Sequence, residues 1–149
     1  MNALRRTALA STVFFGLSVI HAAEPDPKVL SYKLLKDVKW ADTESGIKQA
    51  VLFGDPAKPG WYAVLGKWEK NKMSRPHFHA NDRHITVLSG TWWIGTGAKY
   101  DPASTKPVPA GTYVTHFAKQ VHYDGAKDED VILEIVGMGP ATSTGAEQK

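Results

Sequence analysis

The chain has 149 residues, with 18 lysines and arginines against 15 aspartates and glutamates, and it contains no cysteine. Disulfides, a thiol nucleophile and thiolate metal ligands are therefore excluded. The basic residues are scattered, and no basic run with interleaved aromatic residues is present, so the composition gives no reason to expect a nucleic-acid partner.

The first 23 residues have the pattern of a secretory signal peptide. Arg5 and Arg6 form a short basic start, an uncharged apolar run follows at residues 7–20, and Ala22 and Ala23 precede a polar stretch. The apolar run is shorter than the roughly 20 residues of a membrane span. We therefore expect no stable membrane insertion after cleavage, although an uncleaved anchor is the alternative. The sequence predicts a periplasmic or secreted protein in which residues 24–149 form one domain.

After a proline-rich leader at residues 24–28, residues 29–40 fit either a helix or a strand, and the later patterns favour strands. Strands are expected at residues 47–53, 61–69, 85–89, 91–94, 113–117, 121–123 and 131–136. The glycines and prolines of residues 54–60 predict a turn. Residues 95–106 are expected to form a loop, and the small, polar residues 137–149 are expected to fray. Many short strands separated by turns predict an all-β sandwich or barrel.

Two histidines stand one residue apart, at His77 and His79, in a segment that is expected to be extended. Side chains at positions i and i+2 of a strand point to the same side, so this pair can converge on one metal ion. The pattern is a weak signal alone, but every histidine after residue 23 lies between His77 and His122. The competing interpretation is two polar residues at the end of a strand.

The spacing around these histidines resembles the first motif of the cupin superfamily, G-x5-H-x-H-x3-E-x6-G, over residues 71–90. His77 and His79 match its histidines, and Gly90 matches its closing glycine. Asn71 replaces the opening glycine, a substitution that fits because asparagine tolerates left-handed backbone angles. Arg83 occupies the position of the glutamate.

Residues 111–126 resemble the second cupin motif, G-x5-P-x-G-x2-H-x3-N. Gly111 and His122 match its first glycine and its histidine. Phe117 replaces the proline, Lys119 the second glycine and Ala126 the asparagine. The resemblance as a whole spans residues 71–139.

The resemblance implies an all-β fold, a cupin-type jelly-roll β-barrel, in which His77, His79 and His122 bind a divalent metal ion. Three neutral imidazoles with open positions suit Fe, Mn, Ni, Cu or Zn, and the choice among them stays open. A guanidinium at position 83 cannot coordinate a cation. Some similar cupins, notably thiol and β-diketone dioxygenases, nevertheless hold iron with three histidines and no carboxylate. A barrel that has lost its metal is the alternative.

Arg83 is one of only two arginines after residue 23, and both it and Arg75 flank the His77–His79 pair. A guanidinium forms fixed, bidentate pairs with carboxylates. Arg83 is therefore a candidate catalytic residue that holds a small anionic molecule beside the metal. The alternative is an internal ion pair with a carboxylate such as Glu69 or Glu134, because a buried guanidinium needs an anion.

Two more histidines and two neighbours of His122 complete the candidate residues. His116 is expected to reach the cavity as an acid/base group, whereas His84 is expected on the opposite face of its strand. Tyr123 and Asp124 are expected to orient His122, since a metal-bound imidazole usually donates its other N–H to an oxygen.

The tryptophans are interpreted as packing residues of the core or rim. An exposed strip of them would instead favour dimerisation or a platform for a ligand. Cupins often pair, so the resemblance also implies a homodimer as one oligomeric state.

The leading hypothesis is an exported cupin with one metal site that acts on a small anionic molecule, as a metal-dependent oxidoreductase of dioxygenase type if it is an enzyme. The rival hypotheses are a non-catalytic cupin that binds or senses a small ligand, and a metal-free structural barrel. The sequence contains no nucleophile elbow, P-loop or dinucleotide fingerprint. Its carboxylates are scattered, which argues against a paired-acid glycosidase.

Overall fold

The computed structural model describes residues 23–148, and the chain divides after Tyr32 into two units. In the first unit, the N–H of Val29 donates to the carbonyl of Asp26 in a turn, and the hydroxyl of Tyr32 donates to the carboxylate of Glu24. The signal peptide expected at residues 1–23 lies outside the described residues except for Ala23.

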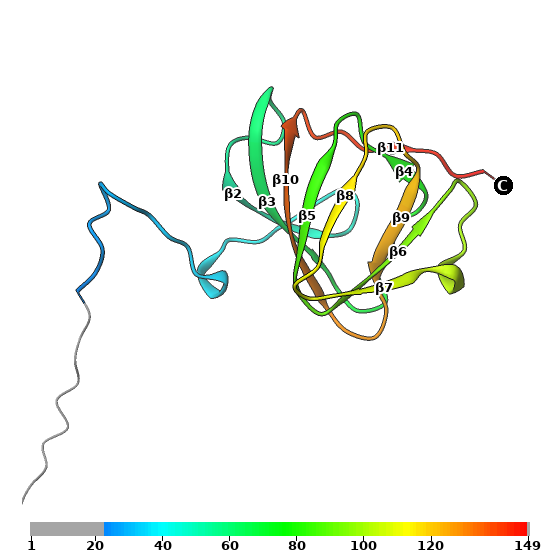
Figure 1. Ribbon diagram of the computed structural model, residues 1–149, viewed down its shortest axis with the longest axis horizontal. Helices are drawn as coiled ribbons and strands as arrows, with labels where there is room; N and C mark the ends of the chain where they lie inside the picture. Colours follow the sequence, from blue (N-terminus) through cyan, green and yellow to red (C-terminus); the bar gives the residue numbers. More distant parts are fainter. Residues whose placement is uncertain (1–22, 149) are drawn as a thin grey trace, which may run out of the picture. The chain divides into compact units, whose positions relative to one another are not determined.

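The second unit consists of two antiparallel sheets, shown in Figure 1. The strand order of the larger sheet is β1 (Ala41–Asp42), β2 (Lys48–Phe53), β3 (Gly60–Trp68), β10 (Val131–Gly139), β5 (Arg83–Ser89) and β8 (Tyr113–His116). The strand order of the smaller sheet is β11 (Thr144–Gly145), β4 (His77–Phe78), β9 (His122–Ala126), β6 (Thr91–Thr96) and β7 (Lys106–Pro109). Two short 3-10 helices are also present, η1 (Leu35–Asp37) and η2 (Pro102–Ser104).

The prediction of an all-β domain is confirmed, and within residues 23–148 there is no α-helix. No strand pairing joins the two sheets in this part of the chain, so they form an open, two-sheet jelly roll and not a closed barrel. None of the described helices is long and apolar enough to cross a membrane.

Several elements differ from the sequence-based expectations. The ambiguous residues 29–40 contain only the short helix η1. Strand β7 begins at Lys106, the last residue of the expected loop, and its prolines fit because β7 is an edge strand that pairs only with β6. The expectation that residues 137–149 fray is wrong over much of its length. Strand β10 continues to Gly139, and β11 pairs with β4.

Apolar side chains from both sheets form the core between them. Trp68 of β3 and Trp92 of β6 meet there, with their ring centroids 6.5 Å apart. Both side chains are buried, whereas Trp61 at the start of β3 is exposed. Along β3, β5 and β10, buried side chains alternate with more exposed ones, and the buried ones supply most of the remaining core. This is the pattern of a sheet with one buried face.

Left-handed turns fix the backbone on both sides of the histidine-bearing strands. Asn71 and Lys119, which replace two motif glycines, have φ angles of 63° and 62°. Gly90 has a φ of 76° in the tight turn between β5 and β6, and a Cβ there would collide with the carbonyl oxygen of Asp130. The N–H of Lys119 donates to the carbonyl of His79 at 2.8 Å. The turn of the second motif thus holds the backbone of the first.

Candidate metal centre

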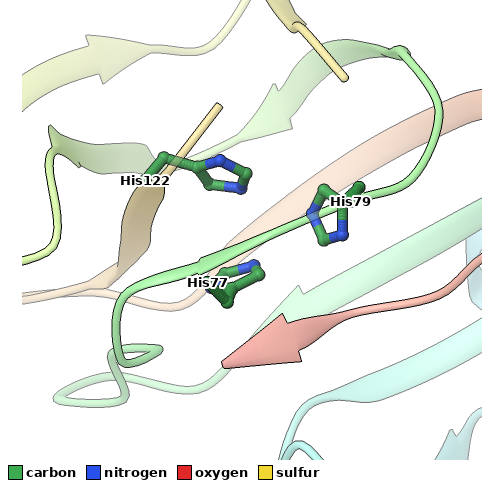
Figure 2. A group of neighbouring side chains, drawn as sticks. All are labelled: His77, His79 and His122. Carbon is green, nitrogen blue, oxygen red and sulfur yellow. The ribbon is translucent and has the colours of Figure 1, made fainter. Parts of the chain in front are cut away.

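The pairing of β4 with β9 brings the two motifs together. His77 is the residue directly opposite His122 in this antiparallel pair, and His79 follows β4 by one residue. Figure 2 shows the three imidazole rings facing a common space between these strands. The register between β4 and β9 therefore brings His122 next to His77, which the i, i+2 spacing of His77 and His79 alone could not do.

The three rings are close enough to share one ion. Their centroids are separated by 4.9 Å for His77–His79, 4.5 Å for His77–His122 and 5.0 Å for His79–His122. One ring nitrogen of each lies within 4.8 Å of the corresponding nitrogens of the other two. The expectation that these three histidines lie together is confirmed.

Each imidazole is oriented by a hydrogen bond from its Nδ1 to a backbone carbonyl. The bonds run from His77 to Arg75 at 2.8 Å, from His79 to Thr142 at 2.9 Å and from His122 to Gln120 at 3.0 Å. A carbonyl oxygen only accepts, so each Nδ1 carries the proton and each Nε2 keeps its lone pair. Histidines that bind metals through Nε2 have this same arrangement, which fixes the tautomer and the ring orientation.

The Nε2 atom of His122 is buried and has no hydrogen-bond partner. A buried acceptor without a donor is costly, so native structures usually supply one or place a cation there. Burial also lowers the pKa of His122 to about 4 and, together with the charge of Arg83, that of His79 to about 3. Both imidazoles are neutral at neutral pH, the form in which histidine binds a metal. The donor set therefore fits a divalent metal ion.

Arg83 begins β5 and lies against His79. Its Nη1 donates to Nε2 of His79 at 3.2 Å, and its Nη2 donates to the carbonyl of Thr142 at 3.1 Å. Within residues 23–148, no carboxylate lies within ion-pair distance of Arg83, so neither Glu69 nor Glu134 is the internal partner considered above. Arg83 is half-buried, and its guanidinium occupies the nitrogen through which His79 would bind a metal.

His116 ends β8 and joins the same group of rings. Its ring centroid lies 3.8 Å from that of His122 and 6.1 Å from that of His79. Burial lowers the pKa of His116 to about 2, with smaller contributions from the neighbouring imidazoles. His84 lies outside the group, where its Nδ1 hydrogen-bonds to the hydroxyl of Tyr113 at 2.6 Å.

Asp124 lies beside His122, near the Nε2 atom of its ring. It was expected to orient His122, but the carbonyl of Gln120 does that, and Tyr123 points its hydroxyl to the carbonyl of Asp101. The carboxylate of Asp124 is buried, and its Oδ2 lies 3.8 Å from Nε2 of His122. Burial raises its pKa to about 6. The i+2 spacing from His122 along a strand was the signal that could have found it.

Arg75 is engaged elsewhere. Its guanidinium forms an ion pair with Glu147 and lies over the ring of Tyr100, 3.9 Å from the centroid. Of the two arginines that flank the His77–His79 pair, Arg83 is therefore the one available to a ligand beside the histidines.

A cavity of about 800 Å³ adjoins the histidine group. Its lining combines the polar residues of the site with apolar core residues such as Trp92, Ile85 and Leu133. The site residues that line it are His77, His79, Arg83, His116 and Asp124. This volume is that of a small-molecule site.

The chain was compared with known families and structures. A family model described as the ChrR cupin-like domain matches residues 31–142. The comparison with curated proteins gave no match.

Among solved structures, the polyketide cyclase RemF from Streptomyces resistomycificus aligns with 16% sequence identity and a TM-score of 0.67, covering 80% of this chain and 87% of that chain. KdgF from Halomonas sp. aligns with 18% identity and a TM-score of 0.56, covering 72% of this chain and 94% of that chain. A conserved protein with a double-stranded β-helix domain from Klebsiella pneumoniae aligns with 18% identity and a TM-score of 0.59, covering 79% of this chain and 97% of that chain. At these identities the similarity shows the fold.

Proposed function

Because the chain belongs to the ChrR cupin-like family, we propose that it binds one divalent metal ion through His77, His79 and His122 and acts on a small anionic molecule in the adjoining cavity. The observation that carries this proposal is the common tautomer of the three imidazoles. Each donates Nδ1–H to a backbone carbonyl, which leaves Nε2 as the ligand atom, and at His79 this atom accepts a hydrogen bond from Arg83 in the absence of a metal.

The metal would supply a Lewis acid or an activator of oxygen at the wall of the cavity. Arg83 would bind the negative oxygen of the ligand. A carboxylate or enolate offers the guanidinium a charged acceptor, which is a stronger partner than the neutral Nε2 of His79. Arg83 must then turn from His79 toward the cavity, and this movement frees the third imidazole.

His116 contributes as a neutral hydrogen-bonding group. With a pKa of about 2, it stays unprotonated at neutral pH and is poorly matched to proton transfer there, since an efficient acid or base has a pKa near the working pH. Its imidazole would hold a hydroxyl or a water in place near His122.

An oxidoreductase of dioxygenase type is the activity that we propose first, because three imidazoles without the motif glutamate resemble the thiol and β-diketone dioxygenases. The rival is a cupin that binds or senses a small ligand without turning it over. RemF is a polyketide cyclase, so the shared fold leaves room for chemistry without oxygen. Oxygen uptake with small diketones, thiols and hydroxy acids separates these proposals, since a binder shows ligand affinity but no consumption.

The metal is tested by elemental analysis of the protein purified without chelators. We expect one equivalent of a transition metal per chain in the wild type and its loss in His79→Ala. His84→Ala is the matched control, because His84 contacts Tyr113 and lies outside the group. A wild-type protein that neither retains nor takes up Fe, Mn, Ni, Cu or Zn would refute the proposal and favour the metal-free barrel.

We also propose that the protein is exported and works in the periplasm or outside the cell, on the strength of the pattern in residues 1–23. Mass spectrometry of the protein from a periplasmic extract should show a mature chain that begins near Glu24. A chain that keeps Met1 and stays in the cytoplasm would contradict this proposal.

A further inference from the structure

Asp124 is held firmly at the edge of the histidine group. It lies on β9 two residues after His122, and successive odd or even residues of a strand share one side. Its backbone N–H donates to Oγ of Ser74 at 2.9 Å, and its carbonyl accepts from the N–H of Ser74 at 2.7 Å. The residue is only 3% exposed, and it lines the cavity.

The side chains of Asp124 and His122 each carry one buried polar atom without a partner. Oδ1 of Asp124 and Nε2 of His122 are buried and have no hydrogen bond. The two side chains approach to 3.8 Å, between Oδ2 and Nε2. Two ligands of one transition metal, each roughly 2.0–2.2 Å from the ion, are separated by a distance of this size. His116, His122 and Asp124 also place one ligand atom each within 4.8 Å of one another.

The charges of the site call for a carboxylate. A divalent ion held by three neutral imidazoles beside the guanidinium of Arg83 would bury three positive charges without an anion, which is strongly unfavourable. The motif position that would normally carry a glutamate holds Arg83 itself. Among residues 23–148, Asp124 is the only buried acidic residue. It is therefore the one group that can offset this charge from inside.

We propose that Asp124 is the carboxylate ligand of this metal site and takes the role that Arg83 removes from the first motif. The inference rests on the proposed metal binding. It adds a fourth protein ligand, from the second motif, to His77, His79 and His122. A site of imidazoles and one carboxylate suits Fe, Mn or Zn, whereas Cu(I) is selected by soft ligands.

Titration of the metal-free protein with Co²⁺ tests the inference, because the ion's visible spectrum reports both affinity and ligand geometry. We expect Asp124→Asn, which keeps the shape of the side chain, to weaken Co²⁺ binding about 100-fold and to change the absorption bands. Losses of this order follow the removal of groups close to a metal. Asp128→Asn, at an exposed position of the next turn, is the control and should leave both readouts unchanged.

The outcomes separate this inference from the proposed function. If the wild type binds no Co²⁺ or Zn²⁺, metal binding itself fails, and this inference fails with it. If the wild type binds Co²⁺ and Asp124→Asn binds it with the same affinity and spectrum, only the role of Asp124 is refuted. Should Asp124→Asn not fold, the ¹³C resonance of the Asp124 carboxyl carbon in the wild type decides. It should shift when Zn²⁺ is added, and a resonance that stays in place refutes the inference.

Discussion

Nη1 of Arg83 donates a hydrogen bond to Nε2 of His79 over 3.2 Å. The same nitrogen is the one that His79 would offer to a metal, because its Nδ1 is bound to the carbonyl of Thr142. Metal binding through His79 and this hydrogen bond are therefore mutually exclusive. The charge of the guanidinium further opposes a cation in the same space.

Replacing Arg83 with glutamine should strengthen metal binding. The variant removes both the competing hydrogen bond and the positive charge, and a hydrogen bond to a charged group contributes about 1.5–3 kcal/mol. We expect roughly a tenfold lower Kd for Zn²⁺, measured by calorimetry on the metal-free protein. In the same variant, binding of a small carboxylate such as acetoacetate to the metal-loaded protein should weaken.

Arg75→Gln is the control for that experiment, because Arg75 pairs with Glu147 and lies over Tyr100. It should change neither the Zn²⁺ affinity nor the carboxylate affinity. Weaker Zn²⁺ binding in Arg83→Gln would contradict the competition. Loss of folding in that variant would show that Arg83 serves the stability of the domain instead.

Acid should destabilise the metal-free protein. Burial lowers the pKa of His122 from 6.5 to about 4 and that of His79 to about 3. Between pH 6.5 and 4 the unfolded chain binds protons that the folded chain does not, so the free energy of unfolding falls as the pH drops. For each of these histidines, the decrease in the free energy of unfolding approaches about 1.4 kcal/mol per pH unit. His116, with a pKa of about 2, adds to it.

Asp124 acts in the opposite direction. Its pKa is raised from 3.8 to about 6, so the folded chain binds a proton between pH 6 and 3.8 that the unfolded chain lacks. Three histidines outweigh this one carboxyl group, and the net effect of acid stays destabilising. Urea denaturation in EDTA at pH 7, 6 and 5 measures it. His116→Asn should make the dependence shallower, and a wild-type profile that is flat over this range would contradict the assignment.

The strands and the pairing of His77 with His79 on one side of the chain could be predicted because their signals are local. β-Branched alternation marks β5 and β10, and the left-handed φ of Asn71 agrees with the tolerance expected of asparagine at a motif glycine. The contact between His77 and His122 depends on long-range pairing of β4 with β9. Only the resemblance to a known motif, and no local pattern, could indicate that pairing.

The roles of Arg83 and Asp124 were harder to predict. The motif position indicated that Arg83 lies beside the metal site, but a loop separates β4 from β5, so its contact with His79 depends on the path of that loop. For Asp124, two competing oxygens were available to orient His122, and the backbone carbonyl of Gln120 does so. Sequence cannot rank a backbone group against a side chain when both are within reach.

The C-terminal segment should be required for metal binding, although its small, polar sequence predicts fraying. The carbonyl of Thr142 accepts from both His79 and Arg83, and β11 pairs with β4 beside His77. Removing residues 142–149 leaves His79 without its orienting partner. We expect Zn²⁺ affinity to fall at least about tenfold.

Calorimetry on the truncated protein measures this loss, with near-UV circular dichroism as the check that the core between the sheets is intact. Removing only residues 148–149 is the matched control and should preserve affinity, since it spares Thr142 and β11. A protein that lacks residues 142–149, folds and still binds Zn²⁺ as the wild type does would show that the segment has no part in the site.

Replacing Lys119 with glycine should stabilise the domain. Lys119 has a φ of 62° at a position where the second motif has a glycine, and a left-handed conformation costs a residue with a side chain about 1–2 kcal/mol. Part of that gain is offset because glycine gains freedom in the unfolded chain, so we expect a net increase of about 0.5–1 kcal/mol in the free energy of unfolding. The hydrogen bond from the residue's N–H to His79 is kept, so metal affinity should not change. Lys99→Gly, at an exposed position without a left-handed φ, should destabilise instead, and equal losses in both variants by urea denaturation would contradict the argument.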